Sequence, residues 1–279
     1  MNIEALYRIT SHNQIVEVDD VSTSLDKVSK KVVFFEKQLP ENKDLGGLLR
    51  KKVIGTIAVV DSFNKTEIKP FDYLTGAENR LTVHLVDEID TVKAIICQPE
   101  GFLTFFSGQC LNIERKTFRV KVVTLSDRAY RGIYEDKSGP KVVELVKEHF
   151  KNLNKSVEVD SLIIPDNKED LIDVIIDVRD NKWDVLITTG GTGIGKRDIT
   201  VETLESFVGK QIPGIMEMIR VKYGKSNPKA LLSRGIAGVM NETLVYTLPG
   251  GVNAISEYLS EIFQTLDHLF YMLNGIDNH

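Results

Sequence analysis

The first part of the chain carries short apolar stretches separated by turn-like segments. Stretches rich in β-branched and aromatic residues are typical of strands, and five occur here: Lys31–Glu36, Val53–Asp61, Leu81–Val86, Val92–Cys97 and Phe102–Phe106. Proline, glycine, asparagine and aspartate gather between them, as they do in turns. Short strands at fairly even spacing indicate a small sheet or partial barrel. We therefore expect residues 1–115 to form a small β-rich domain, and we find no catalytic constellation in it.

From residue 116 onwards, strand-like and helix-like patterns alternate. Apolar runs predict strands at Phe118–Leu125, Val157–Ile164, Val185–Thr189 and Leu244–Leu248. Between and after them, apolar residues recur at spacings of three and four, the pattern of helices with one buried face. This alternation is typical of a doubly wound α/β domain, which we expect to span residues 116–279.

The helix starts of this second domain carry recognisable signals. Helices are predicted at about Gly139–Lys151, Thr200–Val208 and Pro213–Tyr223. A hydroxyl side chain at a helix start accepts from a free amide of the first turn. We therefore expect Ser138 to cap the first of these helices and Thr200 to cap the second.

Polar or glycine-rich motifs follow the carboxyl ends of four predicted strands. In chain order they are Ser126-Asp127, Asp166, the turn Gly190–Gly195 and Pro249-Gly250-Gly251. In an open α/β sheet the carboxyl ends of parallel strands share one edge, and ligands bind in the crevice there. The sequence therefore predicts one crevice lined by all four motifs.

The third of these motifs reads GGTGIGKRD. Its glycines allow the backbone to approach a ligand closely, with amides free to meet an anion, so we interpret the turn as a phosphate site. A plain strand-to-helix connection that needs positive φ angles is the alternative. A P-loop is a further alternative, because Gly190 to Lys196 satisfies GxxxxGK. However, Arg197 stands where a P-loop has serine or threonine, and the helix begins only near Thr200.

Composition narrows the class of protein. The net charge of −5 creates no field that would attract nucleic acid or an anionic membrane. Only Cys97 and Cys110 are present and the five histidines are scattered, which argues against a disulfide framework and a thiolate or histidine metal site. The N-terminus lacks the apolar core of a signal peptide, and the apolar runs are shorter than a membrane span. We therefore expect a cytoplasmic protein with no nucleic-acid or membrane partner.

Six motifs of the second domain occur in a fixed order. They are VVTLSDRAYRGIYEDKSGP, IIPDN, ITTGGTGIGKRDITVE, IPGIMEMIR, LLSRGIAGV and TLVYTLPGG. Together they resemble the molybdopterin adenylyltransferase family, the MogA/MoaB group related to the N-terminal domain of gephyrin. The resemblance covers about Lys116 to Gly275 and implies a three-layer α/β/α fold around a mostly parallel sheet. The chain departs from the family at Val201, where proline is usual, and at Gly251-Val252, where a Ser-Pro pair is common.

The resemblance implies a reaction in which AMP from ATP is joined to the terminal phosphate of molybdopterin and pyrophosphate is released. It also implies that Asp166 and Asp198 are the catalytic residues and that this pair holds Mg²⁺. The implied substrate- and nucleotide-binding residues are Ser126, Asp127, Gly190, Gly191, Thr192, Gly193, Ser233, Arg234, Pro249 and Gly250. Taken alone, each aspartate would also suit a turn or a helix start. Ser233 would equally suit a turn, and Arg234 a structural ion pair.

By the same resemblance, the expected ligands are molybdopterin, ATP as co-substrate and Mg²⁺ as cofactor. Other enzymes of molybdenum-cofactor synthesis are candidate partners, and a homotrimer is the expected assembly. The alternative function is a non-catalytic molybdopterin-binding or scaffold protein of the same fold. The departures at Val201 and Gly251-Val252 favour that alternative, because loop positions there could shape the pterin pocket.

Overall fold

The computed structural model describes residues 6–14, 31–35, 55–62, 68–75, 80–89, 92–99 and 110–274. The chain divides into two compact units, Met1–Lys116 with Asn278–His279, and Thr117–Asp277. Each unit has its own sheet. Of the helices in the described ranges, none combines the length and the apolar character that crossing a bilayer requires.

The first unit is a closed barrel of seven strands. The strands are β1 (Leu6–Gln14), β2 (Lys31–Phe35), β3 (Gly55–Ser62), β4 (Tyr73–Thr75), β5 (Arg80–Ile89), β6 (Val92–Pro99) and β7 (Cys110–Glu114). Their order is β1-β3-β2-β6-β5-β4-β7, and β7 pairs with β1 to close the ring. All neighbours are antiparallel except β2 and β3. Closure pairs each of these strands on both sides, which removes open edges.

The β-rich character predicted for this part of the chain is confirmed, with a complete barrel in place of a partial one. Four predicted strands correspond to β2, β3, β5 and β6, whereas Phe102–Phe106 lies outside the described residues. The sequence pattern does not predict β1, β4 or β7. Strand β4 has three residues and is defined by its pairing with β5 and β7, so its own sequence carries little signal.

The second unit is built on a six-stranded sheet with the order β11-β12-β13-β10-β8-β9. Its strands are β8 (Thr117–Leu125), β9 (Ser156–Ile164), β10 (Val185–Thr189), β11 (Lys210–Gln211), β12 (Ala237–Met240) and β13 (Thr243–Leu248). Strands β9, β8, β10 and β13 are parallel, β12 runs antiparallel to β13, and β11 runs antiparallel to β12. Every residue of β10 and β13 is buried, as expected for strands covered on both faces.

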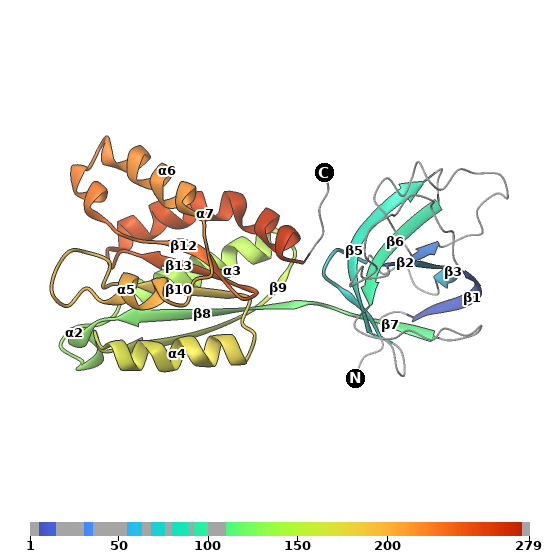
Figure 1. Cartoon of the computed structure of the whole chain (residues 1–279), viewed down its shortest axis with the longest axis horizontal. Coiled ribbons are helices and arrows are strands. Elements are labelled where there is room, and N and C mark those ends of the chain that lie inside the picture. Colours follow the sequence, from blue (N-terminus) through green and yellow to red (C-terminus); the bar gives the residue numbers. More distant parts are fainter. Residues whose placement is uncertain are drawn as a thin grey trace, which may run out of the picture. The chain divides into compact units, whose positions relative to one another are not determined.

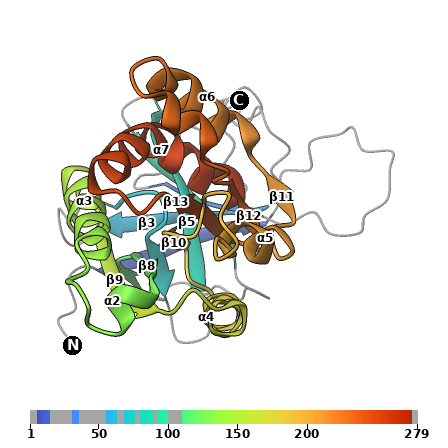
Figure 2. The ribbon, with the colours of Figure 1, turned by 90° about the vertical axis from the view of Figure 1, so that its left-hand side faces the viewer.

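Helices cover both faces of this sheet, so the predicted three-layer α/β/α fold is confirmed. They are α2 (Asp127–Tyr130), α3 (Ser138–Asn152), α4 (Lys168–Asp180), α5 (Thr200–Glu205), α6 (Pro213–Gly224), the 3₁₀ helix η1 (Pro228–Leu232) and α7 (Val252–Leu273). Figures 1 and 2 show α4 and α5 on one face, and α3, α6 and α7 on the other. Leu171 and Ile175 of α4 and Leu204 of α5 are fully buried against the sheet.

The predicted cap at the start of α3 is wrong. Lys137 occupies the N-cap position and forms no side-chain cap. The Asp136 carboxylate satisfies the first turn instead, accepting from the Ser138 amide at 2.8 Å. The Ser138 hydroxyl donates to Gly250 O at 2.7 Å, because the fold brings the end of β13 within its reach. Ser138 therefore ties α3 to the Pro249-Gly250 segment.

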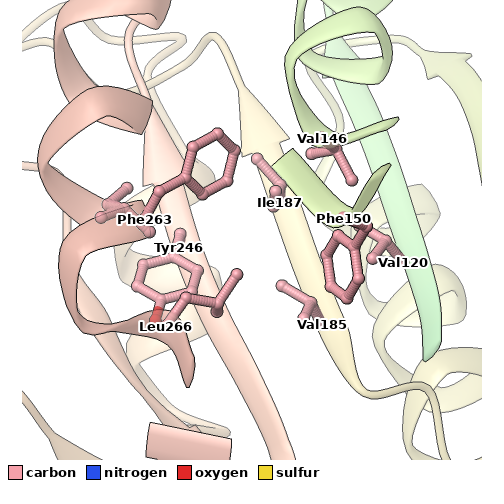
Figure 3. A pocket seen from close by; sticks show the side chains of 9 residues that line it. Val120, Val146, Phe150, Val185, Ile187, Tyr246, Phe263 and Leu266 are labelled. Carbon is pink, nitrogen blue, oxygen red and sulfur yellow. The ribbon is translucent and has the colours of Figure 1, made fainter. Parts of the chain in front are cut away.

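A small internal cavity lies between the sheet and the layer of α3 and α7 (Figure 3). Its volume is about 10 Å³, and its lining comes from Val120, Val146, Phe150, Val185, Ile187, Tyr246, Ile262, Phe263 and Leu266. The hydroxyl of the fully buried Tyr246 has no hydrogen-bond partner among the described residues. Burial raises the pKa of this phenol. A buried polar group without a partner costs stability.

We expect Tyr246→Phe to raise the free energy of unfolding by about 1 kcal/mol, because it removes an unsatisfied hydroxyl and keeps the ring. Tyr223→Phe is the matched control: its hydroxyl donates to the buried Glu261 carboxylate at 2.9 Å, and its loss should cost about 1–2 kcal/mol. Urea unfolding followed by the fluorescence of Trp183, the only tryptophan, measures both changes. A Tyr246→Phe variant less stable than the wild type would show that the Tyr246 hydroxyl does have a hydrogen-bond partner.

Candidate functional site

The ends of β8 and β9 are joined by reciprocal hydrogen bonds between two aspartates. The Asp127 amide donates to Asp166 Oδ2 at 3.2 Å, and the Asp166 amide donates to Asp127 Oδ1 at 3.2 Å. Beside them, the Ser126 amide donates to Ile164 O at 3.0 Å, and Ser126 Oγ accepts from the Ala129 amide as the N-cap of α2. The structure thus brings Ser126, Asp127 and Asp166 together at one edge of the sheet.

The glycine turn that follows β10 is shaped around the carboxylate of Asp198. The Gly195 amide donates to Asp198 Oδ2 at 2.7 Å, and the Asp198 amide donates to Gly195 O at 3.0 Å. A Cβ added at Gly193 would lie 2.8 Å from Asp198 Oδ2, and one at Gly195 would lie 2.9 Å from it. The carboxylate therefore occupies space that only glycine leaves free at these two positions.

The first two glycines of the turn have positive φ angles, 96° at Gly190 and 64° at Gly191. Thr200, predicted as a cap, is instead the first residue of α5, and Ile199 occupies the N-cap position. The Thr200 hydroxyl donates to Gly190 O at 2.9 Å, and its amide donates to Gly191 O at 3.1 Å. The cap prediction is wrong because this hydroxyl reaches back to the turn. Thr200 thereby fixes the glycine conformation.

The amides of Gly191, Thr192 and Gly193 donate to no acceptor within the described ranges. The carbonyls of Thr192 and Gly193, by contrast, accept hydrogen bonds from Arg234. Successive unpaired amides at a turn form a concavity that suits an anion. This geometry is compatible with the interpretation of the turn as a phosphate site. The positive φ angles that the alternative, a plain strand-to-helix connection, requires are present too.

The end of β13 lies directly against the glycine turn. The Gly190 amide donates to Leu248 O at 3.0 Å, and the Thr189 hydroxyl donates to Pro249 O at 3.0 Å. A Cβ added at Gly250 would lie 3.7 Å from the Cα of Gly190. Pro249 and Gly250 therefore form a wall beside the turn, where the sequence places them.

Asp166 and Asp198 lie near each other at the same edge. Burial raises the pKa of Asp166, and the nearby charge of Asp198 raises this pKa further. Mg²⁺ prefers oxygen ligands and is commonly held by one or two carboxylates together with substrate phosphates and water. In the described part of the chain no group of three or more His, Cys, Asp or Glu residues could hold a metal ion. The pair fits a cation that takes its other ligands from substrate and solvent.

We expect Asp166→Asn to raise the thermal midpoint slightly at pH 7, by less than about 3 °C. The folded-state pKa of Asp166 lies above its unfolded value, so the associated stability is present below the unfolded pKa and is lost as the pH rises through the folded pKa. At pH 7 the ionised side chain therefore costs stability that asparagine avoids. Calorimetry at pH 7 and pH 3.5 measures the thermal midpoints of the variant and the wild type. A rise in the midpoint that is as large at pH 3.5 as at pH 7 would contradict the prediction.

The basic residues of the turn differ in their surroundings. The Arg197 guanidinium pairs with the carboxylate of Asp127, whereas Lys196 is exposed. Helix α5 begins at Thr200, so Lys196 lies in the turn and not at the helix start. The local structure thus differs from the strand–loop–helix arrangement of a P-loop, in which the lysine opens the helix.

Arg234 reaches the turn from the connection between η1 and β12, whereas the hydrogen bonds of Ser233 are with residues outside the turn. Arg234 Nε donates to Gly193 O at 2.7 Å, and the guanidinium also pairs with the carboxylate of Glu202. Ser233 Oγ accepts from the Gly235 amide at 3.4 Å. Sequence reasoning misses Glu202, because it lies 32 residues from its partner and no local motif marks it.

An open hollow of about 460 Å³ lies beside the start of α3. Its lining residues are Thr124, Glu135, Asp136, Gly139, Pro140, Ser161, Leu162 and Ile163. The Thr124 hydroxyl donates to Asp136 Oδ2 at 2.7 Å. This hollow contains none of the residues that the sequence predicts as ligands. The hollow is therefore lined by a different set of residues from the candidate site at the strand ends.

The fold defines the class of protein: an α/β domain of the kind in which ligands bind at the carboxyl ends of parallel strands. Residues 121–268, more than half of the chain, match a family described as "Probable molybdopterin binding domain". The chain belongs to this family.

Relatives with curated names agree with this assignment. A molybdopterin adenylyltransferase of Helicobacter pylori is 35% identical over 161 residues, which cover 57% of this chain and 90% of that protein. A molybdopterin adenylyltransferase of Pyrococcus furiosus is 36% identical over 162 residues, which cover 55% of this chain and 92% of that protein. Gephyrin of Dictyostelium discoideum is 35% identical over 162 residues, and the match spans only 22% of its length.

Solved structures share the fold of the second unit. The tungsten cofactor synthesizing protein MoaB of Pyrococcus furiosus has a TM-score of 0.50 at 32% identity, covering 57% of this chain and 98% of that one. A molybdopterin biosynthesis protein of Mycobacterium abscessus has a TM-score of 0.52 at 26% identity, with the same coverage. The predicted resemblance to the MogA/MoaB group is thereby confirmed.

Proposed function

We propose that this chain is a Mg²⁺-dependent molybdopterin adenylyltransferase of molybdenum-cofactor biosynthesis. The observation that carries the proposal is that the neighbouring carboxylates of Asp166 and Asp198 lie beside residues 191–193, whose amides have no acceptor within the described ranges. Such an edge suits a reaction between two phosphate groups, since it offers metal-binding carboxylates and anion-binding amides together. The names of relatives at 34–36% identity support the choice.

In the proposed reaction, an oxygen of the terminal phosphate of molybdopterin attacks the α-phosphorus of ATP. The bond from that phosphorus to the oxygen bridging to the β-phosphate breaks, and pyrophosphate leaves with the electron pair. A new P–O–P linkage joins molybdopterin to AMP. Because the nucleophile is already an anion, no side chain has to remove a proton. Positioning and charge neutralisation are the main requirements.

Asp166 and Asp198 would hold Mg²⁺, which supplies charge neutralisation for the triphosphate when bound. The amides of residues 191–193 would donate to phosphate oxygens, and Gly190 allows the backbone to approach them closely. The other residues proposed to border the substrates are Ser126, Asp127, Ser233, Arg234, Pro249 and Gly250.

The wider organisation is proposed on the family resemblance. Residues 1–115 would be a separate domain attached to the adenylyltransferase domain at 116–279. We propose that the chain assembles as a homotrimer in the cytoplasm and works with other enzymes of molybdenum-cofactor synthesis. The barrel would then be an accessory to the catalytic domain.

Incubating the purified chain with ATP, MgCl₂ and molybdopterin tests the function. Adenylyl-molybdopterin and pyrophosphate should appear in equal amounts, and EDTA should stop their formation. Molybdopterin binding without ATP consumption would instead support the non-catalytic scaffold. Gly251, the exposed N-cap of α7, still favours that alternative, whereas Val201 is buried in α5 and fills the core.

A further inference from the structure

The segment Thr192–Asp198 comprises the later part of the glycine turn and the charged residues that follow it. Within the described part of the chain, two residues outside this segment hold it in place. Asp127 pairs with Arg197, whose side chain is 67% exposed. Arg234 makes the hydrogen bonds that join this segment to the rest of the domain. The Asp127–Arg197 pair joins side chains only, whereas the hydrogen bonds from Arg234 fix backbone carbonyls of the segment. Arg234 is therefore the stronger restraint.

Arg234 binds three carbonyl groups of the turn. Its amide donates to Thr192 O at 3.1 Å, its Nε donates to Gly193 O at 2.7 Å, and its Nη2 donates to Asp198 O at 3.4 Å. With these carbonyls engaged by one residue, the amides of Thr192 and Gly193 are left without an acceptor in the described ranges. Asp198, which carries the proposed metal-binding carboxylate, is held by the same guanidinium.

Arg234 is itself held from two sides. Its guanidinium pairs with Glu202 in the first turn of α5, and this hydrogen bond lowers the pKa of the Glu202 carboxyl. Arg220 of α6 donates to Ser233 O and to Gly235 O, each at 3.3 Å. The backbone on both sides of Arg234 is thereby fixed. Such support is expected for a residue whose own orientation matters.

We infer that Arg234 is a positioning residue that holds the carbonyl side of the turn, so that the turn amides and the Asp198 carboxylate keep their places for the substrates. The planar guanidinium suits this role, because its fork of donors can reach several acceptors at once. In this role it acts through the turn and is not a ligand of the substrate phosphate. Its effect on catalysis rests on the proposed function, whereas its effect on the turn does not.

Arg234→Lys tests the inference, since lysine keeps the charge and loses the fork. In the ligand-free chain, we expect hydrogen exchange of the Gly195 and Asp198 amides to become at least about tenfold faster, with exchange in β10 unchanged. With Mg²⁺, ATP and molybdopterin, we expect kcat to fall about 10–100-fold and the KM for molybdopterin to stay within about threefold. Arg179→Lys on α4 is the control, because that exposed arginine pairs with Asp180.

Glu202→Gln is a second variant, which should accelerate exchange of the same two amides by a smaller factor. Unchanged exchange in both variants would overturn the inference. A rise in KM without a fall in kcat for Arg234→Lys would also overturn it, because a direct substrate ligand would behave in that way. If the wild-type chain forms no adenylyl-molybdopterin, the proposed function fails, and the exchange rates still decide the role of Arg234.

Discussion

Asp198→Asn is expected to lower the turnover of molybdopterin adenylylation by about 10³-fold, with molybdopterin binding retained. Asparagine keeps the size of the side chain and one acceptor oxygen, so the hydrogen bond from the Gly195 amide can persist. The change removes the negative charge that would hold Mg²⁺ beside Asp166. Single-turnover kinetics with a pyrophosphate readout measures the first effect, and fluorescence titration with molybdopterin measures the second.

Asp173→Asn is the matched control, because Asp173 is exposed within α4 and is not one of the proposed site residues. It should turn over at the wild-type rate. An Asp198→Asn enzyme with unimpaired turnover would remove Asp198 from the catalytic pair. Loss of molybdopterin binding together with turnover would instead indicate that the carboxylate organises the whole turn.

Gly190→Ala should lower the free energy of unfolding of the α/β domain by about 3–5 kcal/mol, from backbone strain and overpacking together. The backbone φ is 96°, which alanine adopts poorly, and the new Cβ would lie 2.4 Å from Leu125 O. That oxygen belongs to the backbone of β8 and cannot move aside cheaply. Trp183 is buried in this domain, so its fluorescence during urea unfolding reports the loss.

Gly132→Ala separates strain from crowding. Gly132 also has a positive φ, 69°, but a Cβ there meets nothing within 4 Å. Gly132→Ala should therefore lower the free energy of unfolding by only about 1 kcal/mol. Equal losses in the two variants would show that crowding against β8 is not the cause at Gly190.

Much of the architecture of the second unit can be predicted from local patterns. The apolar runs that mark β10 and β13 are distinct because these strands are buried on both faces. At the start of α4 the Asn167 side chain accepts from the Glu169 amide at 2.7 Å, the usual role of asparagine at an N-cap. The barrel is harder to predict. Strand β1 reads LYRITSHNQ, a stretch too polar to be recognised without its partners β3 and β7.

The sequence alone determines which motifs follow the strand ends of this chain, and the rule that parallel strands share one carboxyl edge is enough to group them. It also indicates where glycine is concentrated. Asp166 and Asp198 both lie in motifs that resemble those of the molybdopterin adenylyltransferase family. These features depend on residue type and short spacing, so they can be read from neighbouring positions.

Only the tertiary structure decides which side chains meet at that edge. Ser138 and Thr200 satisfy the usual rules for caps, yet their hydroxyls donate to Gly250 O and Gly190 O. Arg234 reaches Gly193 across 41 positions of the chain. Such contacts depend on how the elements pack, because the nearest acceptor in space outcompetes the nearest one in sequence. For this reason local patterns predict the crevice, while its supporting hydrogen bonds require the folded domain.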